Sequence, residues 1–115
     1  MIPERDKKLA ELMLYVADRC EGDPAFGATK LNKILFYADF LMYWREGRSV
    51  TGQEYTKQSH GPVPRYGKPV QDALVESGDA VIKSNKYYRH NQKRIVALRE
   101  PDLSGFSGEE IAQVD

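Results

Sequence analysis

The chain has 115 residues, which lies within the usual size range of one domain, so we expect a single domain with its own hydrophobic core. Its single cysteine excludes an internal disulfide framework and a cysteine-rich zinc site. The formal net charge is zero, and no apolar leader follows Met1, so the sequence indicates a cytoplasmic protein.

Residues 4–20 carry apolar side chains at spacings of three and four, a pattern that predicts an amphipathic helix of about four turns. The stripe consists of Leu9, Leu12, Met13, Val16 and Cys20. Two glycines and an Asp-Pro pair follow in residues 21–27 and should end the helix in a turn. We expect Phe26 to pack under this loop and Thr29 to cap the next helix.

The stretch from 30 to 44 is apolar on nearly every side of a helix, so we expect a buried helix around which the rest of the chain folds. Charged residues interrupt it well short of the roughly 20 apolar residues that a membrane span requires. The helix should end near Glu46, with Gly47 in the left-handed conformation. Asp39 lies in the middle, and we expect it to mark a solvated stripe. If it is buried instead, the possible hydrogen-bond donors are Lys33, Tyr43 and His60.

Residues 53–59 alternate weakly between apolar and polar side chains and predict a short strand. Residues 60–64 cannot be helical, because their two prolines lack an amide hydrogen and push the preceding residues into extended conformations. Pro69 is well placed as a first helical residue. It therefore predicts a short helix, which Gly78 should end.

Two β-prone runs, residues 80–82 and 95–98, predict an antiparallel hairpin with a long tip that is both basic and aromatic. The candidate partner-binding residues in this tip are Lys86, Tyr87, Tyr88, Arg89, Lys93 and Arg94. No acid lies between residues 84 and 98, whereas the charged residues from Glu100 onward are all acidic. A basic segment of this kind can serve an acidic protein surface or nucleic-acid phosphates, and it can also be a solvated hairpin.

Ser107, with Glu110 three residues later, has the pattern of a capping box and predicts a further helix. Such a helix has little length in which to bury itself before the chain stops at residue 115. We therefore expect the helix within residues 107–115 to be truncated relative to the natural protein.

The sequence contains little that indicates catalysis. It has no His-x-x-x-His pair, Cys-x-x-Cys pair, Walker loop or Gly-x-Ser-x-Gly turn. A nucleophile and base formed by Cys20 and His60 would need an exposed thiol, whereas helical spacing puts Cys20 on the buried stripe. We expect His60 to hydrogen-bond to the backbone and fix its turn. The sequence predicts no catalytic residue, no metal ligand and no cofactor.

Two segments resemble the signatures of a known family. The first is a Lys-Leu-x-Lys opening followed by apolar residues, an aromatic pair and alanine, and the second is a His-Gly-Pro-Val turn about twenty residues later. The residues that carry the resemblance are Lys30, Leu31, Lys33, Leu35, Tyr37, Ala38, His60, Gly61, Pro62 and Val63. Together they are similar to the Panacea, or SocA-like, antitoxin domain, which is also described among phage-associated GepA-type proteins.

The resemblance implies a domain that binds and neutralises a toxin encoded beside it. In one branch of the family the domain acts as an adaptor that delivers its toxin to a protease. Two departures concern this chain: the connector at residues 48–52 is of a kind that varies within the family, and Pro69 shortens the helix expected after the turn.

These observations predict a small α+β domain, with helices packed around residues 30–44. A short antiparallel sheet should combine residues 53–59 with the hairpin. The function expected is a non-enzymatic, antitoxin-like module that binds a protein toxin, with a protease as a possible further partner and no membrane. The alternative is a winged-helix-like DNA-binding regulator, with the hairpin tip as the wing and residues 69–77 as the recognition helix. Asp72 and Glu76 on that helix suit phosphates poorly.

Overall fold

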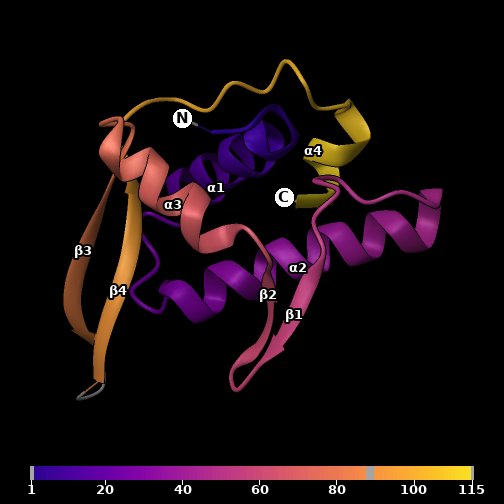
Figure 1. Ribbon diagram of the computed structural model, residues 1–115. Helices are drawn as coiled ribbons and strands as arrows, with labels where there is room; N and C mark the ends of the chain where they lie inside the picture. Colours follow the sequence, from indigo (N-terminus) through magenta and orange to yellow (C-terminus); the bar gives the residue numbers. More distant parts are fainter. Residues whose placement is uncertain (1, 88–89, 115) are drawn as a thin grey trace.

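The computed structural model describes residues 2–87 and 90–114, without the side chains of residues 85, 87 and 90. A 3-10 turn at Glu4–Asp6 opens the fold, and the predicted α+β class is confirmed. The helices and strands in chain order are α1 (Lys7–Arg19), α2 (Ala28–Glu46), β1 (Tyr55–Gln58), β2 (Gly61–Pro64), α3 (Gly67–Glu76), β3 (Ala80–Tyr87), β4 (His90–Ala97) and α4 (Gly108–Val114). Figure 1 shows the helices gathered around α1, with the turn of the β1–β2 hairpin at the bottom of the view, below α2.

Helix α1 is the most enclosed element of the molecule. The predicted stripe is buried from Leu9 to Val16, and Ala10, Leu14 and Ala17 on the other sides of the helix are buried too. Helices α2 and α3 and strand β4 all pack against α1, which explains why it buries more than one face. The centre of the fold is therefore α1 and not α2.

Helix α2 has one buried face and one exposed face, so the prediction that it is surrounded is wrong. Its inner face consists of Leu31, Leu35, Ala38, Asp39 and Met42. The exposed large apolar residues on the other side are Tyr37, Phe40, Leu41, Tyr43 and Trp44. A helix that is apolar on every side is fully buried only if other segments pack on every side of it. Here the segments that pack against α2 leave its outer side exposed.

The ends of α2 agree with the sequence in part. Gly47 adopts the left-handed conformation with a φ of 75° and its amide bonds to the Tyr43 carbonyl, as predicted. The expected cap by Thr29 is wrong, because the helix already begins at Ala28 and the residue at its N-cap is the extended Gly27.

The β1–β2 hairpin pairs Tyr55 with Pro64 and Gln58 with Gly61. The Gly-Pro-Val-Pro part of this rigid segment, Gly61–Pro64, is therefore itself a strand, which the sequence did not predict. Because Pro62 and Pro64 donate no hydrogen bond, β2 is suited to a two-stranded ribbon. The prediction of one sheet that joins residues 53–59 to the later hairpin is wrong, since the fold contains two separate two-stranded sheets among its described residues.

The β3–β4 hairpin agrees with prediction and is longer than the two apolar runs. Ala80 pairs with Ala97 and Ile82 with Ile95, and these four side chains face the core. Helix α3 precedes the hairpin and ends before Gly78, which has a φ of 81°. It begins at Gly67, two residues before the predicted Pro69. Residues 88 and 89 at the tip lie outside the described residues.

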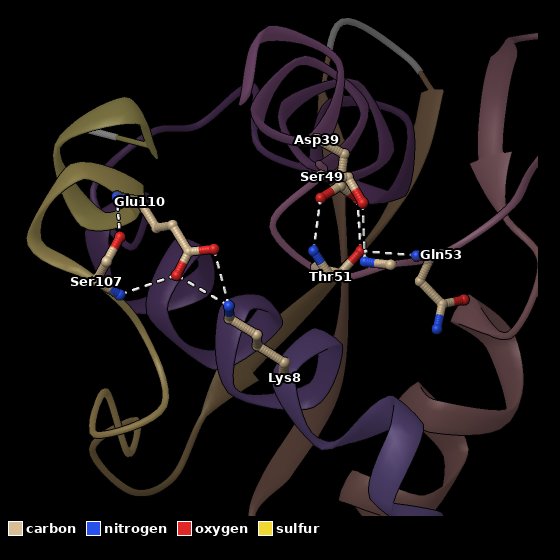
Figure 2. Close-up of polar contacts among 8 residues, drawn as sticks. Lys8, Asp39, Ser49, Thr51, Gln53, Ser107 and Glu110 are labelled. Carbon is tan, nitrogen blue, oxygen red and sulfur yellow. Dashed lines mark hydrogen bonds and ion pairs between the residues drawn. The ribbon is translucent and has the colours of Figure 1, made fainter. Parts of the chain in front are cut away.

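The predicted capping box at the start of α4 is confirmed. The Ser107 amide donates to Glu110 Oε1 at 2.8 Å, and the Glu110 amide donates to Ser107 Oγ at 3.1 Å. Lys8 Nζ on α1 donates to both Glu110 carboxylate oxygens, at 2.9 and 2.8 Å (Figure 2). The C-terminal helix is thus fastened to α1 and packs on α2. No helix in the described part of the chain combines the length and hydropathy that a membrane crossing needs.

Candidate partner-binding site

The outer side of α2 carries the largest group of exposed aromatic side chains among the described residues. We call Phe36, Tyr37, Phe40, Leu41, Tyr43 and Trp44 the aromatic face. A residue in a helix is rotated by about 100° from the one before it, so Tyr37, Phe40 and Trp44 share one stripe, opposite the buried Leu35 and Met42. Trp44 is 79% exposed and Tyr37 is 58% exposed. Groups of exposed aromatic residues on a small protein mark a site for interaction.

The rings of the aromatic face hold one another in place. Phe36 stacks on Phe40 with ring centroids 5.8 Å apart, and Phe40 stacks on Trp44 with centroids 6.5 Å apart. Tyr55 of β1 meets Phe36 edge-on at 5.3 Å. These contacts restrict the rings before any partner arrives, which lowers the conformational entropy lost on binding.

Asp39 is what fastens β1 and its preceding loop to α2. Its carboxylate is 3% exposed and accepts hydrogen bonds from the Thr51 amide at 2.8 Å, Thr51 Oγ1 at 2.5 Å and Tyr55 Oη at 2.6 Å. Figure 2 shows Asp39 pointing at Thr51 from α2. The predictions of a solvated stripe and of Lys33, Tyr43 or His60 as donors are both wrong. The actual donors come from the segment after the helix.

The chemistry of Tyr55 suits this arrangement. Burial raises the pKa of the Tyr55 phenol well above its usual range, and the neighbouring Asp39 carboxylate raises it further. The phenol therefore keeps its proton and donates a hydrogen bond to the Asp39 carboxylate. The outcome is a fixed position for Tyr55, whose ring supports Phe36 at the edge of the aromatic face.

The charged side chains of α2 that lie outside the core are basic until the helix ends. Lys33 lies on the same stripe as Phe40 and Trp44, is exposed, and makes no ion pair within the described part of the chain. Lys30 pairs with Asp23, and Arg45 donates to Gln113 on α4 at 2.8 Å. The one acid of α2 before Glu46 is the buried Asp39.

The two family-signature segments meet in the fold, because β2 packs against α2. Leu31, Leu35 and Ala38 lie on the inner face of α2, whereas Lys30, Lys33 and Tyr37 point outward. Pro62 and Val63 are half-buried in β2.

The His60 side chain is exposed at the turn before β2 and makes no hydrogen bond with any of the residues described. The hydrogen bond from His60 to the backbone that the sequence led us to expect is therefore absent from this part of the chain. The turn instead depends on Gly61, which has a φ of 117°.

The predicted partner-binding residues of the β3–β4 hairpin differ in their surroundings. Lys86 and Lys93 are exposed. Arg94 is occupied within the fold, since it donates to the carbonyl oxygens of Cys20 at 2.8 Å and Glu21 at 3.1 Å. Its guanidinium also lies over the Phe26 ring. Tyr88, Arg89 and the Tyr87 side chain lie outside the described residues.

The described residues offer little for catalysis. No group of three or more histidine, cysteine, aspartate or glutamate side chains in this part of the chain could hold a metal ion. Cys20 is half-buried, and burial raises the pKa of its thiol, which disfavours the thiolate that a nucleophile needs. On α3, the proposed recognition helix of the DNA-binding alternative, Lys68 is paired with Asp72 at 2.8 Å. A lysine that is already neutralised is a poor phosphate ligand.

Comparison with known proteins matches the chain to a family model. The family model described as antitoxin SocA-like, Panacea domain, matches residues 31–115. The matched region includes all of the signature residues except Lys30, together with the whole aromatic face and the capping box. No curated protein and no solved structure matches the chain.

Proposed function

Because the chain belongs to the family of SocA-like antitoxins defined by the Panacea domain, we propose that it neutralises a protein toxin by binding it directly, without catalysing a reaction. The toxin is the product of a gene beside that of the antitoxin. Direct binding accounts for neutralisation with no cofactor and no reactive side chain.

The observation that carries this proposal is the aromatic face of α2. Tyrosine and tryptophan dominate the binding energy of protein interfaces, because they bury a large area at a small cost in side-chain entropy. Three such residues, Tyr37, Tyr43 and Trp44, are each more than half exposed on one side of a single helix. The core does not need them, so their presence on the surface is best explained by a partner.

The basic hairpin supplies a second contact area in this proposal. Lys86 and Lys93 are exposed near its tip, where they can meet acidic groups of a partner, whereas Arg94 fixes the hairpin to the α1–α2 loop. Gln92 adds to this anchoring, since its side-chain amide donates to the Pro24 carbonyl at 2.9 Å.

Rescue of cells tests the proposal. The neighbouring gene is expressed from an inducible promoter with and without the chain, and growth is measured. Wild-type chain should restore growth, whereas the double variant Phe40→Ala with Trp44→Ala should not. Leu98→Ala is the matched control, because Leu98 is also a well-exposed apolar residue but lies after β4. Equal rescue by the wild type and the double variant would contradict the role of the aromatic face.

Delivery of the toxin to a protease is a separate step that the same cells can test. The half-life of the toxin is followed by immunoblot after protein synthesis is stopped. An adaptor should shorten this half-life in the presence of the wild-type chain, whereas an antitoxin that acts by sequestration should leave it unchanged or lengthen it.

A further inference from the structure

We infer that the aromatic face of α2 binds an apolar surface of the toxin whose rim carries carboxylates. The inference rests on the proposed function and deepens it, because it names the chemistry of the partner surface.

The positive charge around the aromatic face is the evidence that the partner surface carries carboxylates. Lys33 lies on the stripe that contains Phe40 and Trp44, and it is exposed and unpaired among the described residues. Lys57 of β1 is also exposed and follows Tyr55 by two residues, so both leave the same side of the strand, the side that meets Phe36. Two lysines that have no acidic partner in the part of the chain that the structure describes thus flank the aromatic rings.

The acids of α2 lie off the stripe that contains Lys33, Phe40 and Trp44. Asp39 is buried, and its oxygens are occupied by Thr51 and Tyr55. Glu46 comes two residues after Trp44, which turns it by about 200° around the helix, to nearly the opposite side. The chain has equal numbers of acidic and basic residues overall, so this local excess of positive charge is a property of the face. Opposite charge on the partner would steer and orient the encounter.

The exposure of the rings is the evidence that the partner surface is apolar and hollowed. Trp44, with 79% of its surface accessible, and Tyr43, with 62%, stand out from the helix. A protruding ring is buried best in a hollow of the partner, as the central anchors of interfaces generally are. A second copy of this chain would present the same protruding rings and the same unpaired lysines, so like charges would meet. A different protein with an apolar hollow and an acidic rim is the better match.

Charge reversal tests the inference. The probe is the toxin identified by the rescue assay, and its dissociation constant is measured by titration of the full chain. Trp44 is the single tryptophan of the chain, so with a tryptophan-free toxin its emission reports on the face itself. Lys33→Glu should weaken binding by about tenfold or more, because it places like charges together. Lys7→Glu, with the same change of charge on α1, should bind as the wild type does.

The partner side is tested by reversing toxin acids one at a time to lysine. One such variant should bind the wild-type chain weakly and restore binding to Lys33→Glu. Wild-type affinity should also fall as salt rises from about 50 to about 500 mM, because exposed charge pairs are screened.

The outcomes separate this inference from the proposed function. Absence of any complex between the wild-type chain and the toxin would overturn both. A complex whose affinity does not change with salt or with Lys33→Glu would contradict the inference of an acidic rim, but it would agree with the proposal that the chain binds the toxin. A blue shift of Trp44 emission that grows with the concentration of the chain alone, with a dimer in sedimentation, would show that a second copy covers the face and would also overturn the inference.

Discussion

Asp39 shows how a single carboxylate can be placed by the helical period. It follows Leu35 by four residues and precedes Met42 by three, so it lies on the inner face between two buried side chains. The sequence therefore contained the signal that Asp39 is buried, but the cost of burying an unpaired charge argued against it. The donors that offset this cost, Thr51 and Tyr55, come from a loop and a strand whose position no local pattern specifies.

The first prediction concerns this cluster. Asp39→Asn should lower the free energy of unfolding by about 2 kcal/mol or more, because an amide cannot accept all three hydrogen bonds and directs its own N–H groups at donors. Urea denaturation measures the change. Asp18→Asn on the exposed side of α1 is the control and should change stability by less than about 0.5 kcal/mol. Equal stability of the Asp39 variant and the wild type would show that the buried hydrogen bonds of Asp39 make no net contribution to the free energy of unfolding.

The second prediction concerns the turn between β1 and β2. His60→Ala should change the free energy of unfolding by less than about 0.5 kcal/mol, because the side chain is exposed and makes no hydrogen bond within the described residues. Gly61→Ala should cost more than about 1 kcal/mol, since alanine is strained at a φ of 117°. Thermal denaturation of both variants decides the matter. A larger loss at His60 than at Gly61 would restore the histidine as the residue that fixes the turn.

At the scale of helices and strands, the sequence predicted correctly the features that depend on interactions between residues close together in the chain. The α1 stripe, the end of α2 at Gly47, the β3–β4 hairpin and the capping box at Ser107 were all found, because each depends on neighbours in sequence. The pairing of β1 with β2 was missed, since two prolines made the second strand resemble a rigid loop. The sequence also led to the wrong central helix, because composition does not tell which apolar helix face is packed against other elements.

The two faces of α2 give the third prediction. Leu35→Ala should lower the free energy of unfolding by about 2 to 5 kcal/mol, because Leu35 is fully buried and a cavity would remain. Trp44→Ala should cost about 1 kcal/mol or less, since only the stacking on Phe40 is lost. Chemical denaturation of the two variants side by side measures both values. Should the tryptophan variant prove as unstable as the leucine variant, the aromatic face would be part of the core.

The candidate site was harder to predict than the fold. The sequence directed attention to the basic hairpin, whereas the structure adds the outer face of α2, whose aromatic residues had been assigned to the core. A helical wheel places Tyr37, Phe40 and Trp44 opposite Leu35 and Met42, which is a usable signal. Sequence alone does not say that the outer side is left uncovered, because that depends on where β1, β2 and α4 pack.

At the scale of the whole molecule, a polar cluster joins segments that are far apart in the chain. Glu11 of α1 accepts two hydrogen bonds from Arg99, both at 2.8 Å, and one from the Asp102 amide at 2.7 Å. Arg99 also pairs with Asp79, at the start of the β3–β4 hairpin. The cluster therefore connects the first long helix to both ends of the hairpin and to the connector that leads to α4.

The fourth prediction follows from the titration of this cluster. Hydrogen bonds from Arg99 hold the pKa of the Glu11 carboxyl below its ordinary value, although burial acts in the opposite direction. A depressed pKa in the folded state stabilises the fold above the unfolded pKa of about 4.3, and this contribution is lost as pH falls through the folded pKa. Glu11→Gln should therefore be less stable than the wild type at neutral pH, and the difference should shrink below about pH 4.

Urea midpoints of the two proteins at neutral and acidic pH measure this effect. Glu46→Gln, an exposed change of the same kind at the end of α2, should change stability by less than about 0.5 kcal/mol. A difference between Glu11→Gln and the wild type that stays constant down to pH 3 would mean that ionisation of Glu11 contributes nothing to it.

The division of α2 into two faces also bears on how such a chain changes over generations. Truncation of a side chain on its inner side should cost stability, because these side chains are buried, but Tyr37, Phe40, Tyr43 and Trp44 lie outside the core. Mutations can therefore accumulate on the outer side at little cost in stability, and each alters the surface offered to a target. If the aromatic face binds a toxin as proposed, replacing a few side chains of one exposed helical stripe would change the surface that meets the toxin without changing the scaffold.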